Sequence, residues 1–324
     1  MVNDVLELAP ELRSRQALLC AGWTDRDLAS AVRDRTLHQL RRGWYVDVGV
    51  WKVMWPEQRH LIEVVAAARE ARGPIVMSHV SAAVLWGLPL YRMAPDRVHI
   101  TSSVPQRASS NVRVERHVAP LGSFDTSVIS GIRCTSLSRT VFDLARSMPL
   151  EAAVSAADAA ERMMALRGRE WDLDAVESWQ AGLAQRLEEA AGARGIRQAR
   201  WVADFADGRA QLPGESVSRL RLHRLGFAAP RLQVGVPAPD GQMYFVDFGL
   251  DDVRAFGEFD GETKYRDEAM RSGRSIEDVL LAEKQREDWI GGRTQRRMAR
   301  WGSSHIRTDE GLARRLGSFG ICPP

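Results

Sequence analysis

Cysteine is scarce in this sequence of 324 residues. The three cysteines, Cys20, Cys134 and Cys322, are odd in number and lie far apart along the chain. They form no C-x-x-C pair, so the sequence predicts neither a disulfide framework nor a cysteine-ligated zinc site. The seven histidines are also scattered, without a pair at ligand spacing, and His79 and His99 are interpreted as core or capping residues.

The sequence also lacks long apolar runs and a strong net charge. The longest apolar run, at residues 64–68, is too short to cross a bilayer. The opening segment MVNDVLELAPE lacks the basic region of a secretory signal. The net charge of +3 excludes a polycation, so any contact with nucleic acid must come from a local patch. We therefore expect a soluble cytoplasmic protein of two or three domains, with no membrane partner.

Lysine is also scarce. It occurs only at Lys52, Lys264 and Lys284, and arginine supplies every other fixed positive charge. Residues 242–265 read QMYFVDFGLDDVRAFGEFDGETKY and predict a hairpin. Two of these lysines, Lys264 and Lys284, lie near this hairpin. Because lysine is a compact charge that can lose its proton, its placement draws attention to this stretch as a candidate chemical site.

The stretch predicts two strands joined by a turn. The first strand, residues 243–249, is apolar and aromatic except for Asp247. The second strand, residues 254–260, carries Glu258 and Asp260. Successive strand side chains alternate between faces, so Glu258 and Asp260 are expected to share one face.

The position of the turn decides which face Asp247 takes. With Asp251 and Asp252 at its centre, Asp247 lies opposite Phe256 and joins the face of Glu258. Three carboxylates on one face repel one another, and a bound Mg²⁺, which takes oxygen ligands, is one resolution. A solvated strand face that binds no ion is the alternative.

An acid on one strand and Glu-x-acid on the next, between two helices, resembles the PD-(D/E)XK nuclease superfamily. More closely, FGEFDGETKY followed by LLAEKQREDWI is similar to the domain related to very-short-patch-repair endonucleases. The resemblance implies an αβββαβ domain and a Mg²⁺-dependent endonuclease acting on nucleic acid. It implies metal ligation by Asp247 and Glu258, with Asp260 as a third acid.

The same resemblance implies further catalytic residues around the two strands. They are Glu215 on the preceding helix, Lys264 or Lys284 as a charge-stabilising lysine, and Glu283 and Arg286 on the following helix. The usual lysine two residues after the glutamate is Asp260 in this sequence, and the segment Glu262-Thr263-Lys264 restores Glu-x-Lys in another frame. Glu283 and Arg286 also fit a solvated helix surface with ion pairs between neighbouring turns.

Residues 1–50 predict a helix, a short turn, a second helix and a hairpin. Thr24 is expected to cap the second helix, with Asp25 and Asp27 in its first turn, where the helix dipole favours acids. This order is typical of a winged helix-turn-helix domain, whose second helix enters the major groove of DNA and whose wing contacts the backbone.

The expected DNA-binding residues come from the second helix and the wing. They are Thr24, Arg26, Ser30, Arg33, Arg41 and Arg42. Phosphate contacts need only such a local cluster. A small helical domain that contacts other proteins is the alternative. The segment GWTDRDLASAVRDRTLHQLRRGWYVD is similar to the N-terminal domain of AbiEi-family antitoxins.

The middle of the chain predicts a mixed arrangement of helices and strands. SHVSAAVLWGLPL and IRCTSLSRTVFDLAR resemble the middle domain of the same AbiEi-like proteins. The resemblance implies a type IV antitoxin that binds double-stranded DNA, represses its own operon and is encoded beside a nucleotidyltransferase-type toxin. We therefore expect an α/β (α+β multidomain) protein with domains at residues 1–50, 51–200 and 201–324.

Overall fold

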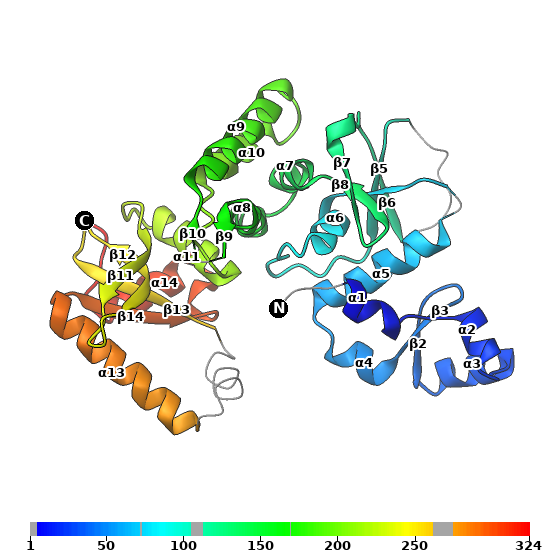
Figure 1. The fold of residues 1–324 in the computed structure, drawn as a ribbon, viewed down its shortest axis with the longest axis horizontal. Helices are drawn as coiled ribbons and strands as arrows, with labels where there is room; N and C mark the ends of the chain where they lie inside the picture. Colours follow the sequence, from blue (N-terminus) through cyan, green and yellow to red (C-terminus); the bar gives the residue numbers. More distant parts are fainter. Residues whose placement is uncertain (1–4, 72, 105–112, 169, 262–274) are drawn as a thin grey trace. The chain divides into compact units, whose positions relative to one another are not determined.

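The computed structural model describes residues 5–71, 73–104, 113–168, 170–261 and 275–324. The chain forms two compact units, Met1–Ala160 with Met164–Ala206, and Glu161–Met163 with Asp207–Pro324. Helices and mixed sheets make up both units, which confirms the α+β class (Figure 1). The first unit contains residues 1–50 together with most of 51–200, and the second begins near the expected boundary at residue 201.

The first part of unit 1 consists of short helices and a three-stranded sheet. Its elements are α1 (Val5–Leu8), β1 (Arg13–Ser14), α2 (Arg15–Cys20), α3 (Asp25–Arg33), β2 (Leu37–Arg41) and β3 (Trp44–Asp47). The strand order is β1-β3-β2, with antiparallel pairs. A small core of Leu18, Leu28, Ala31, Leu37 and Tyr45 holds α2 and α3 on the hairpin.

The rest of unit 1 packs helices on a five-stranded sheet. The helices are α4 (Val48–Val53), α5 (Pro56–Glu70), α6 (His79–Leu85), α7 (Leu137–Ser147), α8 (Leu150–Ala165), α9 (Leu173–Glu189) and α10 (Ile196–Phe205). The strands are β4 (Val76–Met77), β5 (Val98–Ser102), β6 (Val114–Val118), β7 (Thr126–Ile129) and β8 (Ile132–Thr135), in the order β6-β5-β4-β8-β7, and a two-stranded ribbon joins β9 (Leu166–Arg167) to β10 (Glu170–Trp171). Fully buried Leu61, Val84 and Leu144 place the core between the sheet and α5, α6 and α7.

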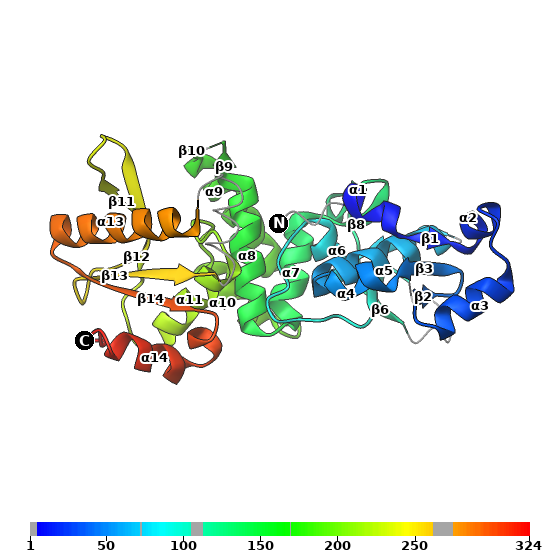
Figure 2. The same cartoon turned by 90° about the horizontal axis from the view of Figure 1, so that it is seen from below.

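Unit 2 is built around a four-stranded sheet. Its main elements are α11 (Pro213–Arg224), β11 (Arg231–Pro237), β12 (Met243–Leu250), β13 (Ala255–Asp260), α13 (Ile276–Thr294), β14 (Arg297–Gly302) and α14 (Asp309–Gly317). The order is β11-β12-β13-β14, antiparallel except for the parallel pair β13–β14. Figure 2 shows α13 on one side of this sheet and α11 and α14 on the other. The elements from α11 to β14 follow the expected αβββαβ order.

The hairpin β12–β13 forms with a longer turn than the sequence predicts. Leu250 pairs with Ala255, so residues 251–254 make the turn, and Arg254 adopts a positive φ of 51°. The expected pairing of Asp247 with Phe256 is therefore wrong, because Phe256 pairs with Gly249. Asp251 and Asp252, the expected centre of the turn, accept hydrogen bonds from residues outside the turn. Asp251, for example, accepts two hydrogen bonds from the Arg231 side chain.

Strand β12 rotates about its own axis at Asp247. Phe248 stacks on Trp301, whose indole Nε1 donates to Ser218 of α11, whereas Val246 packs against Ile290 of α13. Residues two apart in a regular strand share a face, so this arrangement breaks the alternation. Gln233, which lies between the pairs that β11 makes with β12, has a φ of 50° at the same level. The distortion turns Asp247 away from the face that regular alternation would give it.

In the described part of the chain, no helix is both long enough and apolar enough to cross a membrane.

Candidate functional site

The first candidate site is the exposed surface of α3 and the β2–β3 hairpin. Thr24 Oγ1 accepts a hydrogen bond from the Asp27 amide at 3.2 Å, and Asp27 Oδ2 accepts one from the Thr24 amide at 2.9 Å. This reciprocal cap satisfies two amides that a helix start leaves without partners. Arg26, Arg33 and Arg42 are exposed, whereas Leu28 and Ala31 of α3 are buried. The helix therefore presents a polar, arginine-bearing face to solvent.

Ser30 acts within this surface rather than projecting freely from it. Its hydroxyl donates to Asp34 at 3.0 Å and accepts from Arg33 Nη2 at 3.0 Å. The Arg33 Nε lies 3.9 Å from an Asp34 carboxylate oxygen. Ser30 and Asp34 therefore orient the Arg33 guanidinium while leaving it solvent-exposed.

The structure contradicts the predicted role of Arg41 as a wing contact. Its side chain is buried, and Nε donates to Glu70 of α5 at 3.2 Å. The pairing of β2 with β3 shifts register between Gln39 and Arg41, which alters the alternation of side chains at the strand end. Arg41 thus ties the hairpin to α5, and Arg42 is the exposed arginine of the wing.

The second candidate site joins two carboxylates of unit 2. Glu215, in the first turn of α11, is 3% exposed, and its Oε2 accepts from the Gln211 amide at 2.9 Å. The Gln233 side-chain amide lies 3.4 Å from Glu215 Oε2 and 3.3 Å from Asp247 Oδ1, so it bridges the two acids. Asp247 Oδ2 also accepts from the Phe259 amide at 2.8 Å. We define Glu215, Asp247 and Gln233 as the α11 acid site.

Electrostatics distinguish the α11 acid site from a solvated acidic face. Burial, followed by the negative charge of Asp247, raises the pKa of Glu215 to about 8. A buried carboxyl next to another carboxylate either keeps its proton or gains a cation. Carboxylate oxygens suit Mg²⁺, and both acids come from elements that fix their positions. Glu215 and Asp247 therefore fit a divalent cation.

Glu258 does not belong to the α11 acid site. It is 3% exposed, and its two carboxylate oxygens lie 2.7 Å from Arg286 and 2.9 Å from Arg300. Glu283 pairs with the same two arginines, at 2.9 and 2.7 Å. Glu287 also lies 3.7 Å from Arg300. Because two arginines already contact the Glu258 carboxylate, this acid needs no cation. The predicted convergence of Asp247, Glu258 and Asp260 is wrong, because the rotation at Asp247 places it with α11 while Glu258 contacts the α13 residues.

The remaining predicted catalytic residues do not lie in the α11 acid site. Glu283 and Arg286 lie on the sheet-facing side of α13 and form the network with Glu258. Asp260 is half-buried, and its charge is one of those that raise the pKa of Arg300 against the effect of burial. Lys284 is exposed on α13 beside Glu283. Lys264 lies outside the described residues.

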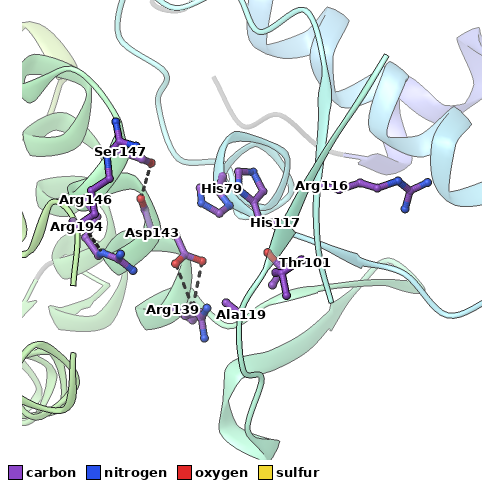
Figure 3. Close-up of a pocket in the computed structure, with 11 residues that line it drawn as sticks. His79, Thr101, Arg116, His117, Ala119, Arg139, Asp143, Arg146, Ser147 and Arg194 are labelled. Carbon is purple, nitrogen blue, oxygen red and sulfur yellow. Dashed lines mark hydrogen bonds and ion pairs between the residues drawn. The ribbon is translucent and has the colours of Figure 1, made fainter. Parts of the chain in front are cut away.

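Sequence reasoning missed a cluster of three histidines in unit 1. His79, His99 and His117 have ring nitrogens within 4.8 Å of one another. Figure 3 shows two of them, His79 and His117, side by side. His117 Nε2 and His99 Nδ1 are 3.0 Å apart, and His79 adopts a strained φ of 49°. His99 and His117 come from the parallel strands β5 and β6, and His79 begins α6. The pairing of β5 with β6 joins His99 and His117, and the start of α6 adds His79, so no fixed spacing in the sequence could reveal the cluster.

Comparison with known proteins gives partial similarities. No family model matches the chain. Two uncharacterized Mycobacterium tuberculosis proteins, MT2308 and Rv2248, are each 32% identical over 132 residues, which is 41% of this chain and 44% of the relative. The match thus spans less than half the length of these relatives. The crystal structure of the RV2827C protein from Mycobacterium tuberculosis aligns over 73% of this chain and 87% of that chain, with 15% identity and a TM-score of 0.33.

Proposed function

We propose that this protein binds double-stranded DNA through α3 and the β2–β3 hairpin and acts as a transcriptional regulator. The element order α1-β1-α2-α3-β2-β3, with β1 paired to β3, is the arrangement expected of a winged helix. In that arrangement the second helix of the helix-turn-helix enters the major groove and the hairpin lies along the backbone. The observation that carries the proposal is the exposure of Arg26, Arg33 and Arg42 on these two elements.

The chemistry of these residues suits a duplex. Arginine guanidinium groups can donate two hydrogen bonds to a phosphate or to a guanine edge. Ser30 and Asp34 hold Arg33 in place before binding, which lowers the ordering cost. Asp25, at the start of α3, is paired with Arg15 at 2.5 Å, so its charge is partly offset near the phosphates.

The resemblance to AbiEi-like antitoxins adds a biological setting to this proposal. In it, the protein represses its own operon and counteracts a nucleotidyltransferase-type toxin encoded nearby. Deletion of the gene in its natural host should then cause growth arrest that is relieved when the neighbouring gene is also deleted. Normal growth of the strain with the single deletion would contradict the antitoxin role but would not contradict DNA binding.

A gel-shift assay in EDTA tests DNA binding directly. The full chain should shift a duplex from the region upstream of its own gene at lower protein concentration than an unrelated duplex of equal length. Arg26→Gln should weaken the specific shift by about tenfold, as expected for loss of one well-placed arginine contact. Arg167→Gln, which changes the charge equally at another exposed position of unit 1, should leave it unchanged. Equal shifts on both duplexes would leave only non-specific binding.

A second function is favoured by the α11 acid site: metal-dependent hydrolysis of a phosphodiester. Glu215 and Asp247 would hold the cation, which would activate water and stabilise charge on the scissile phosphate. Gln233 orients both carboxylates, and the Phe259 amide fixes Asp247. The Glu258 network holds β13 against α13 and β14, so Glu258 supports the strand rather than ligating the metal.

Plasmid cleavage tests this second function. Nicking in Mg²⁺ or Mn²⁺ should disappear in EDTA and in Glu215→Gln, a variant that keeps the shape of the side chain. Single-stranded DNA and RNA of the same sequence identify the preferred substrate. No cleavage of any substrate with either metal would leave the α11 acid site without a hydrolytic role.

A further inference from the structure

Unit 1 contains a cavity of about 500 Å³ between α7, β5 and β6. Its walls include Arg139 and Arg146 of α7, Thr101 of β5, His117 of β6, His79 at the start of α6 and Arg194 before α10 (Figure 3). All six belong to one compact unit. We call this the α7 pocket. Its volume is in the range that small-molecule sites occupy.

The charges around the α7 pocket do not cancel. Arg139 is engaged by Asp143, at 3.1 Å, and by Asp125, at 3.2 Å, and Asp125 also pairs with Arg186, so these two arginines and two acids balance. Arg146 instead donates its Nε to the Arg194 carbonyl at 2.8 Å. Neither Arg146 nor Arg194 forms an ion pair with an acid among the described residues. The pocket therefore has a positive potential.

A buried hydroxyl in the wall lacks a partner. Thr101 is 3% exposed, and its Oγ1 makes no hydrogen bond within the part of the chain that the structure describes. Figure 3 shows this side chain beside His117, at the wall of the pocket. A buried polar atom without a partner costs free energy, and an oxyanion in the pocket would accept its hydrogen bond.

The histidines of the wall suit hydrogen bonding better than metal ligation. The rings of His79 and His117 stack with centroids 3.7 Å apart and planes 19° apart. A ligated metal lies close to the plane of each imidazole, so two stacked, nearly parallel rings do not converge on one ion. Burial, followed by the charges of His117, His99, Arg139 and Arg146, lowers the pKa of His79 to about 2. Neutral imidazoles each keep one N–H to donate, and the same positive potential that favours an anion disfavours a cation.

We propose that the α7 pocket binds the phosphate group of a small phosphorylated molecule. Arg146 and Arg194 supply the charge, and Thr101 and His79 supply neutral donors. The pocket is larger than a phosphate ion needs, which leaves room for the rest of an ester of nucleotide size. The residues of this site differ from those of α3, the β2–β3 hairpin and the α11 acid site. The tests of phosphate binding are therefore independent of the tests of the proposed function.

Calorimetric titration of the full chain tests the site, with inorganic phosphate, ribose 5-phosphate and adenosine 5′-monophosphate as probes. Arg146→Gln should weaken binding about tenfold, as expected for a lost hydrogen bond to a charged group. Arg167→Gln is the matched control, because Arg167 is exposed, belongs to the same unit and is not among the residues that line the pocket. An ester that binds more tightly than inorganic phosphate indicates a phosphorylated metabolite; equal affinities indicate the free ion.

Thr101→Val separates a binding role from a structural one. The valine has nearly the same shape without the hydroxyl, so the ligand-free variant should melt roughly 2 °C or more above the natural protein. Phosphate binding should nevertheless weaken. Three results would overturn the proposal: no binding of any probe at millimolar concentration, equal effects of Arg146→Gln and Arg167→Gln, or Zn²⁺ binding that requires His99 in a protein that does not bind phosphate.

Discussion

At the scale of single residues, the chemistry of unit 2 depends on Glu215. Its carboxyl is buried beside Asp247, and its folded pKa of about 8 lies well above the ordinary value of 4.5. Between these values the folded protein binds more protons than the unfolded chain. Glu215 therefore makes folding less favourable as pH rises from about 4.5 to 8, and a bound cation would remove that effect.

Thermal unfolding of the full chain in EDTA should reveal this proton. The natural protein should lose more stability between pH 6 and pH 8.5 than Glu215→Gln, which has no carboxyl to ionise. The difference should reach a few kcal/mol, since one pKa unit corresponds to about 1.4 kcal/mol. Millimolar Mg²⁺ at pH 8.5 should stabilise the natural protein and not the variant. Parallel pH profiles for the two proteins would show that Glu215 titrates normally.

Substitution of Glu258 should lower the stability of the folded protein in a way that does not depend on a cation. Removing this carboxylate leaves Arg286 and Arg300 in a buried site with one acid fewer. Breaking a buried pair on one side costs about 3–5 kcal/mol. Urea unfolding of Glu258→Ala should show this loss with or without Mg²⁺. A mild effect on stability with complete loss of Mg²⁺ binding would instead restore Glu258 as a metal ligand.

At the scale of elements, α11 packs closely on β13 because its second residue, Gly214, has no side chain. A Cβ added to Gly214 would lie 2.1 Å from ring atoms of Phe259. Gly182, in α9, has no atom within 4 Å of the same position and is exposed. Substitution by alanine should therefore have opposite effects on stability at the two glycines.

Gly214→Ala should destabilise unit 2 by about 1–3 kcal/mol through overpacking. Gly182→Ala should stabilise unit 1 by about 0.5–1 kcal/mol, because alanine restricts the unfolded chain and favours the helix. Chemical denaturation followed by circular dichroism measures both. A neutral Gly214→Ala would mean that α11 and β13 are not in close contact.

Element order was predictable from the sequence, whereas register was not. The cap at Thr24, the hairpin after α3 and the helix from Pro213 follow from local signals that the structure confirms. The register of β12–β13 depends on a four-residue turn and a rotation at Asp247, which are set by packing against Trp301 and Ile290. Arg41 was misplaced for the same reason, since a local register shift accompanies its burial.

At the scale of the whole molecule, the net charge is too small to attract nucleic acid, so any binding must depend on local clusters of charged residues. A net charge of +3 over 324 residues gives little overall attraction to nucleic acid. The exposed arginines of α3 and the wing, the acids of the α11 acid site and the arginines of the α7 pocket are three separate clusters with different chemistry. The histidine cluster was missed because it depends on contacts between distant segments, which the sequence does not encode as a motif.

The measurement that tests the central proposal most directly is the salt dependence of duplex binding by the full chain in EDTA. Each phosphate contact contributes about 0.9 to the slope of log affinity against log salt concentration. Arg33→Gln and Arg42→Gln should each lower that slope by about 1 relative to Arg167→Gln. If both variants keep the slope and affinity of the control, α3 and the β2–β3 hairpin do not bind DNA.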